Sequence, residues 1–400
     1  MAGNNLNEDR SFSEVLKDII RSNTRQYTMI AVLLIIWVIF ACLTSGLFLT
    51  PRNLSNLFMQ MCHIGILTSG MLLVMVAAHI DLSIGSLCGT LGAFVAFLMA
   101  KMGLDPVFAI LLTIVFGFIV GTWHGYWVAF CEVPGFIATL ASMIAFKGGT
   151  LFITNGQTIG EFPPVFKTLG QGYLPRVFMT GENAAFHDLT VIVFAAALVL
   201  FIAVDLRRRQ KRIQNGFSVL PMTFEIIKIA IISTGILAVC GILASYRGIP
   251  VALIVLTCTV SIFTVITTRT PFGRHVYAIG GNIEAARLSG VNVRKTLMTI
   301  FMLEGSLCAV AAIVFAARLN AATTSAGTLF ELDTIAACII GGTSTTGGIG
   351  TVFGAIIGAL VMASLDNGMS LMNLPIMYQY MVKGAILLLA VWIDISNRKK

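Results

Sequence analysis

The chain has 400 residues, of which 57% are hydrophobic and only 11% are charged, and its formal net charge is +8. Soluble domains have roughly 45–50% apolar and about 25% charged residues, so this composition excludes a soluble globular protein. The positive charge does not indicate nucleic-acid binding, because the basic residues gather in short segments beside apolar runs, where attraction to anionic lipid headgroups is sufficient to explain them.

The N-terminal segment, residues 1–27, is predicted to lie outside the apolar part of the membrane. Its stretch SFSEVLKDIIRSN places apolar residues at helical spacing and charged residues opposite them; the apolar set is Phe12, Val15, Leu16, Ile19 and Ile20. This pattern is typical of an amphipathic helix on the membrane face, and equally of a solvated helix packed against another subunit.

Apolar segments follow along residues 28–394, most of them near the roughly 20 residues that a helix needs to cross the hydrocarbon layer. Twelve are predicted, near residues 28–48, 57–77, 84–101, 106–128, 136–153, 189–205, 222–245, 249–268, 297–318, 333–345, 350–368 and 375–394. The tenth is short and polar, which suggests a half-helix. The fold class is therefore an all-α polytopic membrane protein with about 10–12 transmembrane helices and short re-entrant or broken segments. A β-barrel would instead show short alternating segments.

The positions of the basic residues predict which segments face the cytoplasm. They gather in residues 10–25, in loops at 206–221 and 269–296, and in the tail at 395–400. Both termini and both loops are therefore expected on the cytoplasmic side, which agrees with an even number of crossings. The longest outer loop, residues 155–187, has a Pro-Pro pair and scattered glycines, which favours an ordered external cap over a linker.

Two polar, glycine-rich segments interrupt the apolar pattern, HIDLSIGSLCGTLGAF at 79–94 and GGTSTTGGIGTVFGAIIGAL at 341–360. Irregular backbone at membrane depth must be buried in protein or line a wet cavity. One such segment in each half of the chain points to a translocation path at the interface of two repeats. The predicted path residues are Asp81, Ser83, Ser86, Thr343, Ser344 and Asn367.

Two GxxxGxxxG series, at 117–125 and 350–358, are predicted to serve helix packing. Small residues four positions apart let helices approach closely in lipid. A direct role for these glycines in transport is the less favoured interpretation.

The sequence holds no recognisable site for chemistry. The glycine-rich stretch at 341–350 lacks the lysine followed by Ser or Thr that a phosphate-binding loop needs, so a partner must hydrolyse ATP if transport uses it. The eight cysteines and five histidines have no metal-ligand spacing, and we predict no catalytic residue, metal or cofactor. An ion-coupled carrier would keep ionisable residues in its spans. Glu304 is such a residue, and a satisfied structural contact is the simpler interpretation of it.

The polar stretch GGNIEAARLSGVNV, at 280–293, is predicted to form a short helix between two spans. Asn282 can cap its start, and Gly290 can end it in a left-handed conformation. Glu284 in the first turn suits the helix dipole and can pair with Arg287 three residues later. So short a helix is not stable alone in water. It is either a docking element for a partner or a plain connector.

The stretch RTPFGRHVYAIGGNIEAARLSGVNV, at 269–293, resembles a cytoplasmic loop of the binding-protein-dependent sugar permeases. These are the membrane subunits of ABC importers for ribose, xylose, arabinose and related sugars. IDLSIGS, VPGFIATLASMIAFKGG and ELDTIAACIIGGTSTTGGIGT are similar to the same family, in order, over nearly the whole chain. MASLDNGMSLMN and VKGAILLLAVWID most resemble its xylose branch, as does the extra pair of spans around the 206–221 loop.

This resemblance implies the ABC importer permease fold and a coupling helix that fits a groove in the ATPase subunit. The residues implied in that contact are Glu284, Ala285, Ala286, Arg287 and Gly290. It also implies the partners: two ABC ATPase subunits, a second permease copy, a periplasmic or extracellular sugar-binding protein, a monosaccharide, and the lipids of the inner (plasma) membrane. His79 and Glu304 depart from the family pattern.

The function implied is that of a permease subunit, not an enzyme, that translocates a monosaccharide, with xylose as the first candidate. A multiple-monosaccharide permease for glucose, galactose or arabinose is the alternative within the family. An ion-coupled secondary sugar carrier is the alternative from a different class.

Overall fold

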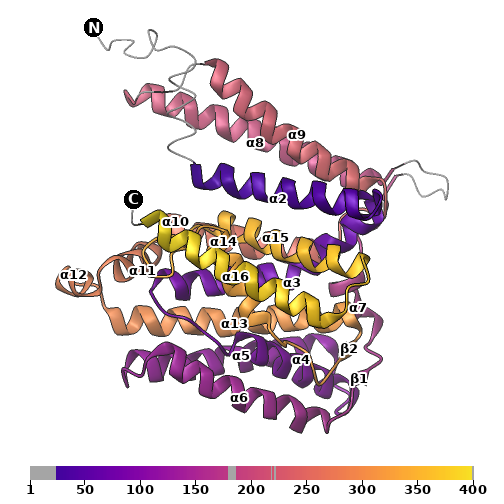
Figure 1. Cartoon of the computed structure of the whole chain (residues 1–400), viewed down its shortest axis with the longest axis vertical. Helices are drawn as coiled ribbons and strands as arrows, with labels where there is room; N and C mark the ends of the chain where they lie inside the picture. Colours follow the sequence, from indigo (N-terminus) through magenta and orange to yellow (C-terminus); the bar gives the residue numbers. More distant parts are fainter. Residues whose placement is uncertain (1–23, 179–185, 218, 220–221, 399–400) are drawn as a thin grey trace. The chain divides into compact units, whose positions relative to one another are not determined.

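The computed structural model describes residues 24–178, 186–217, 219 and 222–398, and helices dominate it (Figure 1). The chain divides into two compact units, which are described separately. The core unit comprises residues 28–172 and 250–400, and the hairpin unit includes residues 173–249. The amphipathic helix predicted around residues 12–20 lies outside the described residues.

The elements of the core unit follow the predicted spans closely. In chain order they are α2 (Thr24–Leu43, within the unit from Thr28), the 3₁₀ turn η1 (Leu47–Leu49), α3 (Pro51–Val76), α4 (Ile84–Ala100), α5 (Pro106–Ala129), α6 (Gly135–Thr154), β1 (Ile159–Gly160), α7 (Pro164–Gln171), α10 (Val251–Arg269), α11 (Pro271–Gly281), α12 (Ile283–Leu288), α13 (Val293–Leu319), β2 (Ala321–Ala322), α14 (Phe330–Ile340), α15 (Val352–Leu371) and α16 (Ile376–Arg398).

The predicted all-α polytopic class is confirmed. Within the described residues, nine helices are long and apolar enough to cross a membrane, and residues 28–43 and α4 form two shorter apolar helices. The nine are α3, α5, α6, α8, α9, α10, α13, α15 and α16. α14 has 11 residues, about 16 Å at 1.5 Å per residue, so it cannot cross a roughly 30 Å hydrocarbon layer alone.

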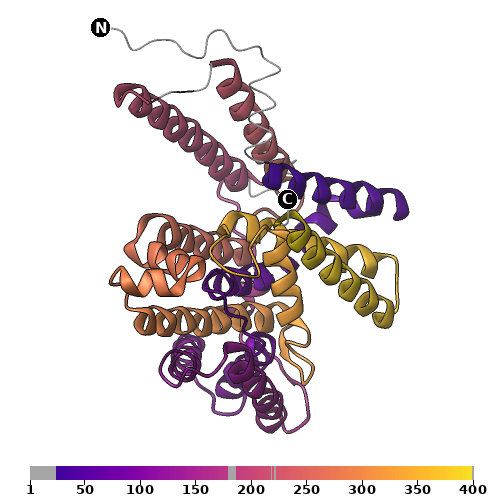
Figure 2. The same cartoon turned by 60° about the vertical axis from the view of Figure 1, so that its left-hand side comes forward.

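α13 lies inside the core unit and packs against α3, α4 and α5 (Figure 1 and Figure 2). α5 runs antiparallel to it and approaches through the first predicted glycine series. A Cβ added at Gly121 would lie only 2.2 Å from the Phe301 carbonyl oxygen, so only glycine fits there. In the second series, a Cβ at Gly358 would lie 1.9 Å from the Ala337 carbonyl oxygen on α14. The predicted packing role of both series is confirmed.

The helices of the core unit run between two ends (Figure 1). α11 and α12 lie at one, which we call the α12 end. At the other, the cap end, β1 pairs with β2 through Ile159 and Ala322. Phe162 and Phe166 are buried there in a cluster with side chains of α4 and α13. These residues belong to the stretch 155–187 that the sequence predicts as a cap, of which residues 179–185 lie outside the described chain.

α8 (Asp188–Gln214) and α9 (Met222–Ala244) pack against each other in the hairpin unit. Lys228 of α9 forms ion pairs with Asp205 of α8, at 2.8 Å, and with Glu225. The loop predicted at 206–221 begins too early, because α8 continues through the basic run to Gln214. Leu, Arg, Lys and Gln are good helix formers, and cations near a helix C-terminus complement its dipole.

Candidate functional site

α12 is a six-residue helix capped at both ends, as the sequence predicts. The Asn282 side-chain oxygen accepts a hydrogen bond from the Ala285 backbone N–H at 2.9 Å. At the other end, Gly290 has a φ of +82° and its N–H donates to the Arg287 carbonyl at 3.0 Å. The Val291 N–H donates to the Ala286 carbonyl at 3.1 Å, which completes a Schellman cap.

Most of the predicted coupling residues present their side chains to solvent. Glu284, Ala285, Arg287 and Gly290 are exposed, and Glu284 pairs with Arg287 at 3.3 Å. Ala286 is only 4% exposed, so its side chain faces the interior of this chain and not a partner.

Two exposed residues of α12, Ile283 and Leu288, are absent from the sequence prediction. Leu288 is 89% exposed, the highest value among the large hydrophobic side chains of the described residues. A leucine this exposed at the end of a short surface helix suggests a surface that a partner covers. In the sequence, Leu288 could have been noticed as an apolar residue inside the polar stretch at 280–293.

The helix before α12 is held by backbone contacts at the α12 end. A Cβ at Gly280, in the last turn of α11, would lie 1.6 Å from the Val76 carbonyl oxygen and 2.5 Å from the Gly348 nitrogen. The Gly348 N–H also donates to the Val76 carbonyl at 2.8 Å. The Tyr277 hydroxyl donates to the Gly350 carbonyl at 2.7 Å. α11 is therefore tied directly to the end of α3 and to the turn at 341–351.

α4 and α14 both begin inside the bundle, N-terminus against N-terminus. Cys308, near the middle of α13, donates through its Sγ to the Ile84 carbonyl at 3.7 Å, which places the start of α4 at that depth. A Cβ at Gly85 would lie 2.4 Å from the Gly327 carbonyl oxygen, just before α14. Residues 77–83 reach this depth from the α12 end, and residues 323–329 reach it from the cap end.

Each half-helix, together with its non-helical arm, runs from one end of the core unit to the other. The second polar segment also lies beside the residue that precedes the first. A Cβ at Gly347 would lie 2.8 Å from the Ala78 side chain, immediately before the first segment.

Five of the six predicted path residues are buried outside the pocket described below, three of them around the start of α4 and two in the turn between α14 and α15. Asp81 is 2% exposed, and its Oδ1 accepts hydrogen bonds from the Ser83 N–H at 2.7 Å and the Ser83 hydroxyl at 2.6 Å. Ser86 is buried in the first turn of α4, and Thr343 and Ser344 are buried in the turn between α14 and α15. The structure brings these residues into packed polar backbone layers, and none of them lines the pocket described below.

Three carboxylates lie in the helices around these segments, of which Asp333 and Glu304 are buried and Asp366 is half-buried. Lys383 of α16 bridges Asp333 of α14, at 2.8 Å, and Asp366 of α15, at 2.9 Å. Glu304 is 1% exposed, and neither carboxylate oxygen has a hydrogen-bond partner among the described residues. The expectation that Glu304 makes a satisfied contact is therefore wrong. Within the same residues, no group of three or more His, Cys, Asp or Glu side chains could hold a metal ion.

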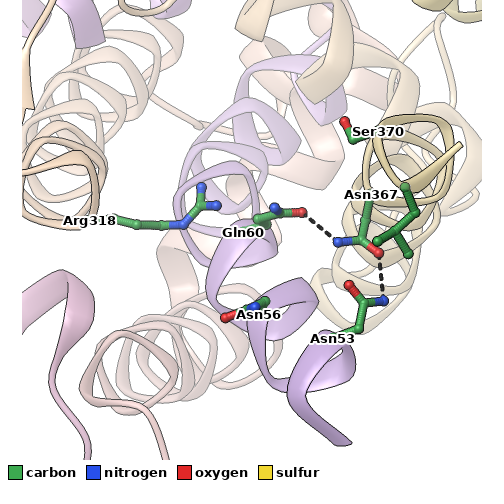
Figure 3. A pocket seen from close by; sticks show the side chains of 7 residues that line it. Asn53, Asn56, Gln60, Arg318, Asn367 and Ser370 are labelled. Carbon is green, nitrogen blue, oxygen red and sulfur yellow. Dashed lines mark hydrogen bonds between the residues drawn. The ribbon is translucent and has the colours of Figure 1, made fainter. Parts of the chain in front are cut away.

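A polar pocket of about 410 Å³ lies at the cap end (Figure 3). It is lined by Asn53, Asn56 and Gln60 of α3, Arg318 of α13, and Asn367, Ser370 and Leu371 of α15. Asn53 Nδ2 donates to Asn367 Oδ1 at 2.8 Å, and Asn367 Nδ2 donates to Gln60 Oε1 at 3.3 Å.

Of the six predicted path residues, only Asn367 lines this pocket. The α3 residues were missed, although Asn53, Asn56 and Gln60 are spaced three and four apart on one face of an apolar helix. That spacing is the signal that could have found them. Arg318 carried no comparable signal, because it comes from a distant part of the chain.

The chain is similar to known membrane permeases over almost its whole length. A family model described as branched-chain amino acid transport system / permease component matches residues 53–391. The chain is 44% identical to the xylose transport system permease protein XylH of Haemophilus influenzae, over 94% of this chain and 98% of that protein. It is 43% identical to XylH of Escherichia coli K12, over 94% and 93%. It is 32% identical to the ribose import permease protein RbsC of Bacillus subtilis, over 92% and 91%. No solved structure matches the chain.

Proposed function

Because the chain belongs to the branched-chain amino acid transport system / permease component family, we propose that it is the membrane-spanning subunit of an ABC importer for a monosaccharide, foremost xylose. The observation that carries the proposal is its identity of 43–44% to xylose permeases along nearly their full length, against 32% to a ribose permease. ATP is hydrolysed by a partner subunit, since this chain has no phosphate-binding loop of its own.

α12 is the proposed coupling helix. Its exposed face, made by Glu284, Arg287 and the protruding Leu288, fits into a groove of the ATPase subunit. Movement of α12 passes through the backbone contacts of Gly280 to the end of α3 and to the turn at 341–351. Those two segments adjoin the half-helices, so a push on α12 reaches the middle of the bundle without passing through flexible side chains.

The orientation follows from this assignment. The α12 end faces the cytoplasm and the cap end faces outward, in the inner (plasma) membrane. The start of α2 lies at the α12 end, because α2 runs parallel to α15: Trp37 donates to Ser364 at 3.0 Å, and Phe40 contacts Gly368 one turn further on. α16 ends there as well, since Asp394 accepts a hydrogen bond from Thr345 at 3.3 Å. Both termini are thus proposed to be cytoplasmic.

The assembly we propose contains two permease copies around the path, two ATPase subunits below them and an external sugar-binding protein above the cap. Within this family, a permease for several monosaccharides, such as glucose, galactose and arabinose, is the nearest alternative. An ion-coupled secondary carrier is favoured by one observation, the buried and unpartnered carboxylate of Glu304.

Reconstitution separates these possibilities. The permease is purified with the ATPase and binding protein that accompany it and placed in liposomes. We expect labelled xylose to enter only when ATP and the binding protein are both present, with or without an ion gradient. Uptake by the permease alone, driven by an ion gradient, would establish the carrier. Equal inhibition of uptake by glucose, galactose and arabinose would establish the multiple-monosaccharide permease.

A further inference from the structure

The polar pocket at the cap end has a composition that suits a sugar. We propose that it is the subsite that receives a neutral monosaccharide on entry into the translocation path, an inference that rests on the proposed function. Sugar hydroxyls both donate and accept hydrogen bonds, and so do carboxamides, while a guanidinium supplies several donors in a fixed fork. The pocket presents both kinds of group on three different helices (Figure 3).

Two of the pocket's polar side chains are held in place by hydrogen bonds, and three other polar groups are free to bind a ligand. Asn53 and Asn367 are 8% and 5% exposed, and they are held by their mutual bond and by the bond from Asn53 Nδ2 to the Phe48 carbonyl at 2.8 Å. The Asn56 side chain, the Gln60 amide nitrogen and the Arg318 guanidinium have no hydrogen-bond or ion-pair partner in the described part of the chain. Figure 3 shows Arg318 reaching toward Gln60. These three groups can bind sugar hydroxyls without breaking the hydrogen bonds that hold Asn53 and Asn367.

The volume of the pocket and its lining residues both indicate a site that a cargo passes through and does not stay in. The volume of about 410 Å³ lies within the roughly 300–1,000 Å³ of small-molecule sites. None of the seven lining residues is aromatic, so the stacking platform that strengthens many sugar sites is missing. A transport site must bind well enough to accept its cargo and weakly enough to release it.

The occupant is neutral. Every lining residue except Arg318 is uncharged. α13 and α15 both end at the pocket with partial negative charge, while Arg318 and the N-terminus of α3 contribute positive charge, so the charges largely cancel and the pocket has no strong field to hold an ion.

The pocket is also connected to the proposed coupling helix. α3 carries Asn53, Asn56 and Gln60 in its first turns, and its last residue, Val76, contacts α11 and the 341–351 turn. One continuous helix of 26 residues therefore links the sugar subsite with the segment that α12 moves.

The test uses the reconstituted permease–ATPase complex with its binding protein and labelled xylose. Gln60→Ala and Asn56→Ala should each reduce xylose transported per ATP hydrolysed about tenfold, the loss expected for roughly one hydrogen bond to the cargo. Stimulation of ATP hydrolysis by the loaded binding protein should persist, because α12 is untouched. Gln210→Ala, at an exposed glutamine near the end of α8, is the matched control and should leave the ratio unchanged.

The outcomes are distinguishable. If the unaltered complex transports xylose and both pocket variants keep the full ratio, the pocket assignment is wrong and the proposed function stands. If the unaltered complex shows no ATP-dependent uptake, the proposed function itself fails, and the subsite with it. If the corresponding sugar acid, xylonate, competes better than unlabelled xylose, the neutral assignment is overturned. The Asn56 side chain makes no hydrogen bond to any described residue, so Asn56→Ala keeps the test decisive should Gln60→Ala lower abundance.

Discussion

Gly85, in the first turn of α4, lies in backbone contact with Gly327, immediately before α14: a Cβ at Gly327 would come within 1.9 Å of the Gly85 carbonyl oxygen. This contact joins two half-helices from opposite halves of the chain, N-terminus to N-terminus, in the interior of the core unit. Irregular backbone at this depth is tolerated only where it is buried in protein or lines a wet cavity. Gly85 and Gly327 are buried, whereas Thr324, Ser325 and Thr328 beside them are exposed.

Substitution of Gly327 should therefore prevent normal assembly of the two half-helices. Gly327→Ala adds a Cβ where no space exists and forces a side chain onto a φ of +79°, which together cost several kcal/mol. Gly148→Ala is the control, because a Cβ there meets nothing within 4 Å. Folded protein in detergent, measured by size-exclusion chromatography of a fluorescent fusion, should fall for Gly327→Ala only. Equal yields would contradict the close contact.

Removing the cation beside Asp333 should lower the stability of the protein, whereas removing the charge of Glu304 should not. Lys383→Met leaves the Asp333 carboxylate, 4% exposed, without its cation, and losing one partner of a buried ion pair costs about 3–5 kcal/mol. Glu304→Gln removes a carboxylate that has no partner, so stability should stay the same or rise. Thermal unfolding of the purified variants gives the comparison.

A double variant separates charge from packing at the same site. Lys383→Met combined with Asp333→Asn should recover much of the loss in melting temperature caused by Lys383→Met alone. A double variant no more stable than the single one would mean that Lys383 acts through packing.

The path residues should respond to the transport cycle. In a background without the native cysteines, Asn56→Cys in the pocket should react with a water-soluble thiol reagent in the resting state. Ser83→Cys and Ser344→Cys should be protected at rest, because Ser83 and Ser344 are at most 2% exposed, and should become reactive during ATP turnover. If both stay unreactive in every nucleotide state, these segments are packing elements and not part of the path.

Topology can be tested with a reporter that is active only outside the membrane. Fused after Lys400, it should be silent, since we assign the end of α16 to the cytoplasmic face. The same reporter inserted after Gln157, at the cap end, should be active. Activity at Lys400 would reverse the assigned orientation and place α12 out of reach of an ATPase.

Much of the helical fold was predictable because lipid imposes a simple pattern: apolar runs of a fixed length become helices. α12 was predicted in detail for another reason, since Asn282 and Gly290 are local signals whose hydrogen bonds involve only near neighbours. α8 was underestimated because its basic residues were interpreted as loop, although they favour helix.

The pocket and the meeting of the half-helices could not be predicted in the same way. Asn53 and Asn367 are far apart in sequence and meet only through the packing of α3 on α15, so neither stretch alone indicates a pocket. The contact between Gly85 and Gly327 can likewise be recognised only once the structure gives the positions of both residues. Leu288 was overlooked because an apolar residue beside two spans is unremarkable until its exposure is known.

The central claim is that α12 transmits work from a partner's ATP cycle, and it is tested most directly in the assembled, reconstituted complex. The variants are Glu284→Lys, which reverses the charge of the first turn, Leu288→Ala, which removes the protruding side chain, and Gly290→Val. A Cβ at Gly290 meets no atom of the described residues within 4 Å, so the last costs about 1–2 kcal/mol of left-handed strain and otherwise affects only a docked partner. Leu200→Ala, at an exposed leucine of α8, is the control.

We expect the three α12 variants to lose both sugar-stimulated ATP hydrolysis and xylose uptake at normal abundance in the membrane, with Leu200→Ala fully active. Full transport by Glu284→Lys and Gly290→Val would show that α12 is an ordinary connector and contradict the claim.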